Sequence, residues 1–536
     1  MPSIGRRTVI AGAAGLGALG IAGQFLDDGP MPGTLGGADF ARGHRLRDGG
    51  FPPPTIEERT DILIAGGGVA GLAAGWTLAE AGVTDFQLLE LENATGGNAR
   101  ASRNAISAYP LGAHYLPIPN REARALRHML TRFGMIIGEE GGAPVYDRYQ
   151  LCADLEERLF WRGKWQEGLF PASGLSPKDI ADRAAFDAAM AGYAKAIGQD
   201  GRPAFASPLA YSSSDPAFTA LDAISFAAWL DARGLTSPIL RAYVRYCCRD
   251  DYGCEPDHVS AWAGIHYFAA RRGWAAQGAG DTELTWPEGN ARLVTQMAAR
   301  FPAHIRGGRT VFHIEASGAG ATVHNFDHAR QISIRTTARA TILAMPHFIA
   351  CRVAKGIGDS KGFTYGPWIV ANVSVTRPPQ GKGTPLAWDN VSTASDSLGY
   401  VVATHQTSSA AAGPTVLTWY MPLSAMNVAK ARKLMLQRTL AAWQEIVRDD
   451  LLTLNPDLAG AITRIDVWRW GHAMIRPTPG FLFTTAPAAR AGAKPPLFLA
   501  HSDLSGLSLF EEAHYRGTLA AEGAMQHLGH AFESLI

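Results

Sequence analysis

The stretch ILIAGGGVAGLAAG, residues 62–75, joins an apolar run to a glycine-rich turn and a helix-forming segment. Its first three residues are apolar, which is typical of a strand buried on both faces of a parallel sheet. Gly66, Gly68 and Gly71 follow the G-x-G-x-x-G spacing. In that motif the first glycine allows a tight turn, the second lets a pyrophosphate approach the backbone, and the third lets the helix pack on the strand. A helix is predicted over residues 70–81, with its N-terminus toward the phosphates.

A second apolar run, residues 86–89, ends in Glu90. This acid falls close to the ~20-residue offset after the third glycine at which a carboxylate binds a ribose hydroxyl. The alternative is a glycine-rich loop in an ordinary strand–helix–strand unit. Such a unit does not require the strand, the three glycines, the helix, the second strand and the acid to occur together at this spacing. The pattern therefore predicts a Rossmann-like dinucleotide-binding domain, and the rest of the chain has to say which dinucleotide it holds.

Length and composition exclude several classes of protein. The chain has 536 residues, well beyond the ~150 usual for one domain, and 47% of them are hydrophobic, enough for a large core. Lys plus Arg number 49 and Asp plus Glu 48, so a net charge of +1 provides no basic field for nucleic acid. The cysteines, at positions 152, 247, 248, 254 and 351, show no zinc-like spacing. No metal site is predicted, and one disulfide stays possible if the protein is exported.

The N-terminal segment has the features of a targeting signal. Residues 1–25 contain Arg6–Arg7 followed by an uncharged, glycine-rich stretch. This resembles a twin-arginine signal, which implies delivery of the folded protein to the periplasm by the twin-arginine translocase. A weak membrane anchor is the alternative, since 18 uncharged residues just reach the length of a membrane span. Residues 26–57 are rich in Gly, Pro and Asp and are predicted to form a linker.

Two further stretches identify the dinucleotide. Residues 91–120 contain the pair Gly96–Gly97 and then the segment Gly112–Ala113–His114–Tyr115. Residues 496–525 contain an apolar run ending near Asp503, then a turn and a helical pattern. With the glycine turn, these stretches resemble the flavin-containing amine oxidase superfamily, which includes monoamine and polyamine oxidases, protoporphyrinogen oxidase and phytoene desaturases. The resemblance implies that FAD is the cofactor.

The resemblance also assigns positions to the parts of FAD. The segment 112–115 would pass the flavin ring, Val311 would lie on the strand whose backbone meets adenine, and Asp503 would bond the ribityl chain. Asn98 departs from the family pattern, in which an arginine commonly follows the glycine pair, so either Arg100 takes over that phosphate contact or the contact is lost. The residues expected to bind the cofactor are Gly66, Gly68, Val69, Ala70, Gly71, Glu90, Gly96, Gly97, Asn98, Arg100, Gly112, Ala113, His114, Tyr115, Val311, Asp503 and Leu509.

An α/β fold with a discontinuous domain is expected. The Rossmann-like FAD-binding domain would comprise residues 58–120, 285–350 and 465–536. An inserted α+β substrate domain would comprise residues 121–284, helical by pattern, and 351–464, rich in β-like runs. Ligands would bind at the carboxyl ends of the parallel strands.

Few side chains need be catalytic, because a flavin carries the chemistry itself. His114 and His472 are the candidates, since the resemblance places both of their segments beside the flavin. For each, a structural role is an equal alternative. Asp250 and Asp251 are candidates for binding a cationic amine, with a solvated helix end as the alternative.

Four further positions depart from the amine oxidase pattern. The two aromatic residues of the monoamine oxidase cage correspond to Ala473 and Leu509. The cysteine that links covalently to the flavin corresponds to His472, which excludes a cysteinyl link. The family lysine near flavin N5 corresponds to Thr376 or Arg377.

These features favour an exported FAD-dependent oxidoreductase that is amine oxidase-like. It would oxidise a C–N or C–C bond of a small molecule by hydride transfer to flavin N5, with O2 or a quinone as acceptor. One alternative is a desaturase or protoporphyrinogen oxidase-like enzyme with a lipophilic substrate and a wide apolar pocket. Another is a non-enzymatic flavoprotein that serves as a binding partner, with no substrate-sized cavity above the flavin.

Overall fold

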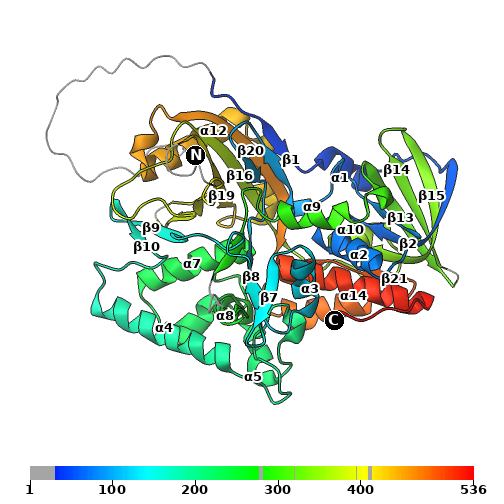
Figure 1. The fold of residues 1–536 in the computed structure, drawn as a ribbon, viewed down its shortest axis with the longest axis horizontal. Coiled ribbons are helices and arrows are strands. Elements are labelled where there is room, and N and C mark those ends of the chain that lie inside the picture. The colour runs from blue at the N-terminus through cyan, green and yellow to red at the C-terminus, as the bar shows by residue number, and fades with distance from the viewer. Residues whose placement is uncertain (1–29, 277–281, 319, 394, 408–412) are drawn as a thin grey trace, which may run out of the picture.

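The computed structural model describes residues 30–536 apart from 277–281, 319, 394 and 408–412 (Figure 1). Two large β-sheets with helices packed against them organise this part of the chain. The segment 1–25, predicted to be a twin-arginine signal, lies outside the described residues. Among the helices of the described ranges, none combines the length and apolar character that crossing a membrane requires.

The nucleotide sheet has seven strands in the order β12–β3–β2–β15–β14–β13, with β21 beside β15. The pairs β2–β3, β2–β15, β3–β12 and β15–β21 are parallel, whereas β13, β14 and β15 form an antiparallel meander. The carboxyl ends of β2, β3 and β21 therefore meet at one edge, where a doubly wound sheet binds its ligand. The strands are β2 (Ile56–Ala65), β3 (Phe86–Leu89), β12 (Ile305–Arg306), β13 (Arg309–Ser317), β14 (Gly320–Asp327), β15 (Ile332–Leu343) and β21 (Leu497–Leu499).

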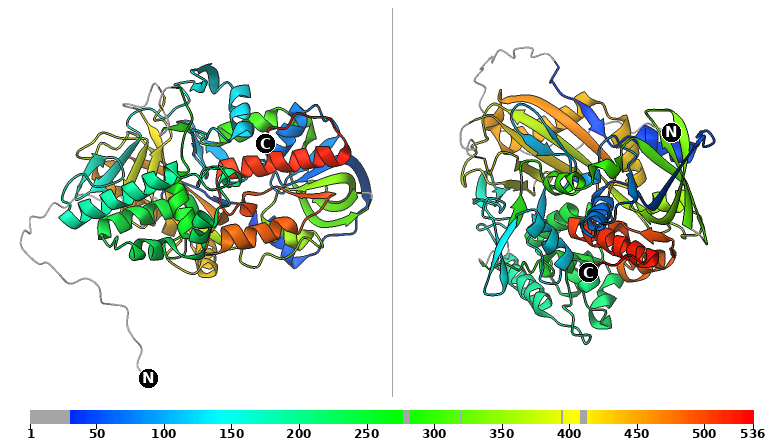
Figure 2. Two further views of the ribbon diagram at one scale, coloured as in Figure 1. Left: turned by 90° about the horizontal axis from the view of Figure 1, so that it is seen from below. Right: turned by 45° about the vertical axis from the view of Figure 1, so that its right-hand side comes forward.

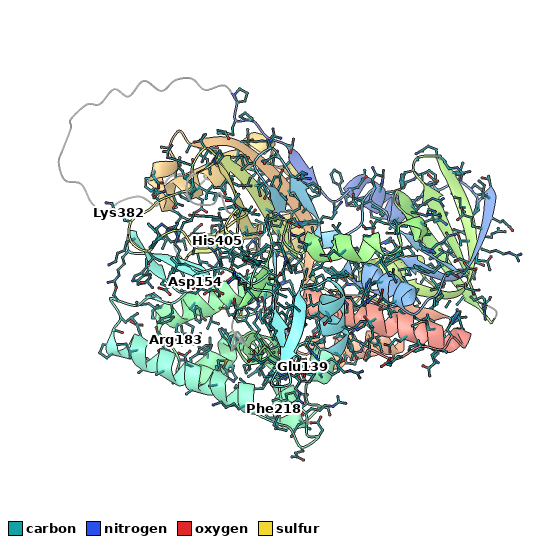
Figure 3. All side chains as sticks on the ribbon, in the orientation of Figure 1. Glu139, Asp154, Arg183, Phe218, Lys382 and His405 are labelled. Carbon is teal, nitrogen blue, oxygen red and sulfur yellow. The ribbon has the colours of Figure 1, made fainter. Side chains whose placement is uncertain are left out.

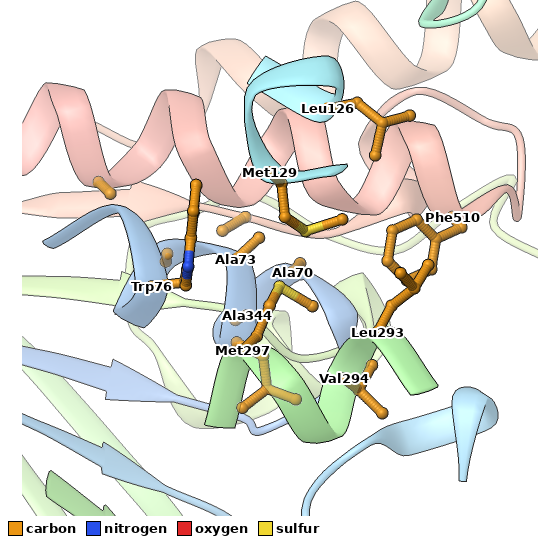
Figure 4. Close-up of a cluster of buried hydrophobic side chains, with 14 of the residues drawn as sticks. Ala70, Ala73, Trp76, Leu126, Met129, Leu293, Val294, Met297, Ala344 and Phe510 are labelled. Atoms are coloured by element: carbon orange, nitrogen blue, oxygen red, sulfur yellow. The ribbon is translucent and has the colours of Figure 1, made fainter. Parts of the chain in front are cut away.

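Helices α2 (Val69–Glu80), α3 (Arg124–Arg132), α9 (Ala291–Ala299) and α14 (Phe510–Leu528) pack together beside this sheet, and both views of Figure 2 show α14 along it. Most of α2 is buried, because α14 and α9 both pack against it. Trp76, Met129 and Met297 lie in this core (Figure 4). A Cβ on Gly517 of α14 would lie 2.1 Å from the carbonyl oxygen of Ala70, so a glycine is required where these two helices touch.

The second sheet has eight strands in the order β1–β20–β16–β19–β18–β17–β9–β10. Its strands are β1 (Leu35–Gly37), β9 (Glu157–Trp161), β10 (Lys164–Glu167), β16 (Tyr365–Val375), β17 (Asp389–Ser392), β18 (Gly399–Val402), β19 (Thr415–Pro422) and β20 (Ile462–Ile475). All residues of β16 and β19 are buried. Helices α11 (Val428–Gln437) and α12 (Leu440–Leu454) contribute Met435 and Trp443, respectively, to the core on one face of this sheet.

A layer of helices completes the second lobe: α4 (Pro177–Lys195), α5 (Pro216–Thr219), α6 (Phe226–Ala232), α7 (Pro238–Tyr252) and α8 (Ala261–Ala269). Buried aromatic side chains such as Trp229 and Trp262 fill it, and Figure 3 shows how side chains occupy the space between the elements. The five cysteines are free thiols. The shorter elements are α1 (Phe40–Asp48), α10 (His347–Val353), α13 (Ala486–Ala491), β4 (Ala101–Arg103), β5 (Ala108–Pro110), β6 (Tyr115–Pro117), β7 (Ile136–Glu140), β8 (Ala143–Tyr146) and β11 (Glu283–Thr285).

The range 26–57, expected to be a linker, contains structured elements. β1 pairs in parallel with residues 467–469 of β20, α1 follows it, and β2 already begins at Ile56. A Cβ on Gly36 would lie 2.5 Å from the Trp468 ring, so the glycine that suggests a flexible linker instead permits a close strand contact. β20 also extends the second sheet from within the range expected for the FAD domain. The remaining domain boundaries stay a prediction.

Candidate functional site

The glycine turn lies between β2 and α2. Gly66 has a φ of +112° and donates its N–H to the carbonyl oxygen of Leu89 at 2.8 Å. A Cβ on Gly71 would lie 1.9 Å from the Gly66 carbonyl oxygen, so no side chain fits there. The free N–H groups at the start of α2, around Gly68 and Val69, are the kind that bind phosphate at a helix N-terminus.

Glu90 lies directly after β3 and is only 9% exposed. Its Oε2 accepts the N–H of Gly67 at 2.6 Å, and its Oε1 accepts the N–H of Glu92 at 2.8 Å. Burial raises the pKa of Glu90, against the effect of these two backbone hydrogen bonds. Each carboxylate oxygen keeps acceptor capacity beyond its one backbone donor, which is what binding two ribose hydroxyls requires.

A second glycine pair faces the first turn. Gly96 donates its N–H to the Gly67 carbonyl oxygen at 2.7 Å. A Cβ on Gly97 would lie 3.1 Å from the Cα of Gly68, so backbone alone lines the space between the two loops. A side chain on Gly97 would fill this space, whereas a Cβ on Gly96 would lie 2.9 Å from the Arg100 side chain. The residues present therefore fit a dinucleotide diphosphate.

Asn98 and Arg100 both bind protein groups. Asn98 Nδ2 donates to the Ala473 carbonyl oxygen at 2.5 Å. The Arg100 guanidinium lies 3.4 Å from a carboxylate oxygen of Glu92 and 5.3 Å from the centre of the Trp468 ring. Arg100 is thus engaged by a carboxylate and an aromatic face, and its role as a phosphate ligand stays a prediction.

A cavity opens beyond the two glycine loops, between the nucleotide sheet and the second lobe. It is lined by Asn98, Gly112, Ala113, His114, Tyr115, Pro117, Ser207, Asp250, Asp251, His266, Arg271, Asn290, Trp368, Val370, Tyr420, Trp470, Ala473, Met474, Ser508, Leu509, Phe510 and Glu511. The fold thereby brings the segment 112–115 and Leu509 into one site. A Cβ on Gly112 would lie 2.3 Å from the Asn98 carbonyl oxygen, which explains the glycine there.

Two buried polar atoms of this lining, Asn290 Oδ1 and Trp368 Nε1, have no hydrogen-bond partner among the described residues. Unsatisfied buried polar groups are costly, and a bound ligand is one explanation for them. With the backbone-lined space between the glycine loops, they fit a cofactor that has a diphosphate at one end and a polar ring at the other. FAD is such a cofactor.

Val311 and Asp503, two further residues expected to bind the cofactor, are not among the described residues that line this cavity. Asp503 Oδ2 accepts the Tyr365 hydroxyl at 2.6 Å and the N–H of His347 at 2.9 Å. Asp503 Oδ1 lies 3.1 Å from His501 Nδ1. Val311 is buried on β13, beside a register shift in that strand.

The structure separates the two candidate catalytic histidines. His114 lines the cavity and stacks on Tyr420, with ring centres 4.6 Å apart. Burial lowers the pKa of His114 to about 4, so its imidazole is neutral at neutral pH. His472 is not among the lining residues and stacks instead on Phe348, with ring centres 4.7 Å apart. The register between β16 and β20 shifts at this point of β20, so alternation along the strand does not predict which way His472 faces.

Thr376 and Arg377, the residues expected to correspond to the family lysine near flavin N5, are not among the described residues that line the cavity. Thr376 and Arg377 follow the end of β16, where Arg377 donates to the carbonyl oxygen of Asp457. Trp368 and Val370 of β16 line the cavity instead, and no lysine is among the described lining residues. This difference follows from the register of β16, which sequence comparison alone does not fix.

Acidic side chains occupy the side of the cavity formed by α7. Asp251 Oδ1 accepts Arg271 Nη2 at 2.9 Å and the Tyr115 hydroxyl at 3.3 Å. Burial raises the pKa values of Asp250 and Asp251. The alternative of a solvated helix end therefore does not hold for these two residues.

Three more buried carboxylates, those of Glu157, Glu283 and Asp389, lie near Asp250 and Asp251. Asp389 and Glu157 are direct partners on the parallel strands β17 and β9. Burial raises the pKa of Glu157 to about 7 and that of Glu283 to about 8, and neighbouring carboxylates add to both shifts. Sequence reasoning missed these three residues because they come from separate strands and match no motif. We call Glu157, Asp250, Asp251, Glu283 and Asp389 the acidic wall.

A family model described as an NAD(P)-binding Rossmann-like domain matches residues 64–133. Among solved structures, a putrescine oxidase bound to putrescine aligns with a TM-score of 0.63 and 16% identity, over 88% of this chain and 100% of that one. Cyclohexylamine oxidase from Brevibacterium oxydans IH-35A aligns with a TM-score of 0.62 and 18% identity, over 88% and 99% of the two chains. A fatty acid isomerase from P. acnes aligns with a TM-score of 0.58 and 16% identity, over 86% and 98%. No curated protein sequence matches the chain.

These similarities confirm the predicted α/β fold class and the Rossmann-like domain. They also confirm, at the level of fold, the resemblance to flavin amine oxidases. The same fold carries an isomerase among these neighbours, so the reaction has to be argued from the site.

Proposed function

We propose that the protein is an FAD-dependent oxidoreductase that oxidises an amine carrying two positive charges. The cofactor is supported by the two glycine loops, by Glu90 and by the fold shared with putrescine and cyclohexylamine oxidases. FAD, when bound, supplies the acceptor for the hydride that leaves the substrate carbon. The chain's own residues bind the amine, orient it and hold its charge.

The acidic wall is the observation that carries the substrate class. It contains five carboxylates, and Arg271 is the cation that four of them share. Like charges on directly opposed strand positions, such as Asp389 and Glu157, destabilise a sheet. A bound cation would remove this cost by neutralising the charges. A metal ion is not favoured, since no group of three or more His, Cys, Asp or Glu side chains in the described ranges is arranged to hold one.

The geometry suggests where each end of such an amine would lie. The rings of Tyr420 and Trp388 pack against His114 of the segment 112–115, with ring centres 4.6 and 5.6 Å from that of His114. The carbon to be oxidised would lie on their flavin side. The second ammonium would lie among Glu157, Glu283 and Asp389.

A lipophilic substrate is the alternative candidate, because a fatty acid isomerase shares the fold. The charged groups of Asp250, Asp251, Arg271 and Glu511 in the lining oppose it, since burying a charge against hydrocarbon is costly. The non-enzymatic alternative requires a flavin without a cavity above it, and the lining residues described above enclose one.

Anaerobic stopped-flow reduction of the reconstituted protein tests the proposal. The panel contains diamines, n-alkylamines of equal chain length, amino acids and a long-chain fatty acid. We expect diamines to bleach the flavin with an apparent Kd at least about tenfold below that of the equal-length monoamines. A tenfold difference in Kd corresponds to the free energy that one charge-assisted contact contributes. Bleaching only by monoamines or by the fatty acid would reject the proposed substrate class. Reoxidation of the bleached flavin with O2 and with a quinone then identifies the electron acceptor.

Diamine affinity is expected to rise with pH. The carboxylates of Glu157 and Glu283 have raised pKa values of about 7 and about 8, so they are neutral below those values and become charged as the pH rises through them. A dication binds the charged form. The apparent Kd should therefore fall about tenfold or more between about pH 6 and about pH 8.5, since one pKa unit corresponds to 1.36 kcal/mol. Equal affinity at both pH values would contradict the role of the acidic wall.

His114→Phe is expected to keep FAD and to slow flavin reduction by less than about tenfold. An imidazole with a pKa of about 4 is a weak proton acceptor at neutral pH, and Phe preserves the stack on Tyr420. His472→Ala should reduce at the wild-type rate, because that ring lies outside the cavity. A loss of about 100-fold or more in either variant, measured by stopped flow, would show that its histidine is the general base.

Export to the periplasm is a further part of the proposal, supported by Arg6–Arg7 and the uncharged stretch that follows. Replacing both arginines with lysine should leave the protein in the cytoplasm, as measured by cell fractionation. Unchanged delivery would reject the twin-arginine route. Recovery of the wild-type protein in the membrane fraction would support the alternative of an N-terminal anchor.

A further inference from the structure

The segment 33–51, which we call the N-terminal strap, connects the two lobes. At one end β1 pairs with β20, and a Cβ on Gly33 would lie 1.9 Å from the carbonyl oxygen of Ile465. At the other end Phe51 stacks on Phe312 of β13, with ring centres 4.3 Å apart. Arg45 covers the Phe51 ring at 4.6 Å. The strap is therefore fixed at both ends, with α1 between them (Figure 1).

Helix α1 lies against the loop that follows Glu90. The Asp39 N–H donates to Glu92 Oε1 at 2.7 Å. Arg42 Nη1 donates to the Leu91 carbonyl oxygen at 2.8 Å and to Asn93 Oδ1 at 2.9 Å. Glu92 also donates its N–H to Glu90. The strap thus holds the residues adjacent to the carboxylate that is placed to bind ribose.

The same helix reaches toward the other end of the dinucleotide site. The guanidinium of Arg469, on β20, lies 6.0 Å from the centre of the Phe40 ring of α1. His472 packs beside Tyr365, whose hydroxyl donates to Asp503. α1 therefore lies between the loop that follows Glu90 and β20, the strand that carries His472.

Helix α1 is rich in arginine, and two of these side chains pair within their own segment. Arg42 lies 3.0 Å from the N-cap Asp39, and Arg47 pairs with Asp48. Arg100 is bound to Glu92, the residue that also accepts the N–H of Asp39. The contacts of α1 therefore fix the loop that follows Glu90, and Arg47 takes no part in them.

We propose that α1 forms the outer wall of the FAD site and that the N-terminal strap retains the cofactor by holding the loop that follows Glu90, where the ribose would bind. This inference rests on the proposed function only in taking FAD as the ligand. It makes the strap a part of the cofactor site, so FAD enters while the strap is displaced and is held once the strap is seated.

Limited trypsin digestion of the full-length protein tests the inference, since Arg42, Arg45 and Arg47 are cleavage sites within α1. We expect cleavage in α1 to be at least about tenfold slower with FAD bound than in the apoprotein, because bound ligand lowers the population of the open strap. Mass spectrometry identifies the cut sites, and flavin absorbance of the same sample reports loading. Equal cleavage rates in α1 with FAD bound would overturn the inference, whereas failure to bind any FAD would overturn the proposed function instead.

The rate of FAD dissociation provides a second measurement. Arg42→Ala removes two hydrogen bonds to the loop 91–93 and should speed FAD release about tenfold. Arg47→Ala is the matched control, because that side chain is 59% exposed and pairs only with its neighbour Asp48. FAD release that is equally fast in wild type and in Arg42→Ala would show that the strap is structural only.

Discussion

Replacing Glu157 with Gln and Asp389 with Asn in one variant is expected to raise the apparent Kd for a diamine by about 10- to 150-fold. The two carboxylates would share the second ammonium, and a charge-assisted contact of this kind contributes roughly 1.5–3 kcal/mol. The Kd for a monoamine of equal length should change little, because it places no charge among these residues. The measurement is the concentration dependence of flavin reduction for both amines.

The same variant has a second expected result that separates binding from folding. The two side chains are direct partners on β17 and β9, and burial together with the neighbouring Glu157 raises the pKa of Asp389. Removing both charges should leave the Tm of the apoprotein unchanged or higher. Glu167→Gln on β10 is the control, because its carboxylate is exposed on the neighbouring strand. Equal losses of diamine and monoamine affinity would show that the acidic wall does not recognise a second charge.

Glu90→Ala is expected to weaken FAD binding by about 10- to 150-fold. The substitution removes the acceptors for the ribose hydroxyls, and hydrogen bonds to a charged group contribute roughly 1.5–3 kcal/mol. It also removes the two contacts that Glu90 makes to the N–H groups of Gly67 and Glu92, which orient the glycine turn. Fluorescence titration of the apoprotein with FAD measures the effect.

Glu57→Ala provides the matched control for this variant. Glu57 lies on β2, like the start of the glycine turn, but its side chain is 72% exposed. Its replacement should leave FAD affinity unchanged. An unchanged FAD affinity in Glu90→Ala would reject the assignment of Glu90 to the ribose, and absence of flavin from the reconstituted wild-type protein would reject FAD as the cofactor.

Local pattern was sufficient to predict the nucleotide-binding half of the protein. The apolar run of β2, the glycines at 66, 68 and 71, and Glu90 after β3 lie within about 30 residues, and each is constrained by backbone geometry that its neighbours set. A glycine required by a positive φ or by a close backbone contact has no substitute. Its spacing therefore identifies the turn without any tertiary information.

Tertiary structure decided the substrate side and the N-terminal strap. The acidic wall combines residues from α7, β9, β11 and β17, which lie far apart in the sequence and share no periodicity. His472 faces away from the cavity because of a shift in strand register, and Trp368 lines the cavity because of the register of β16. The strap reads as a linker because its glycines are typical of flexible chain, whereas here they allow β1 to lie against β20. The sequence by itself determined the turn that is expected to bind the dinucleotide, because the geometry of that turn is local. Only the fold decided which charged side chains meet around a substrate, because that depends on how distant strands pair.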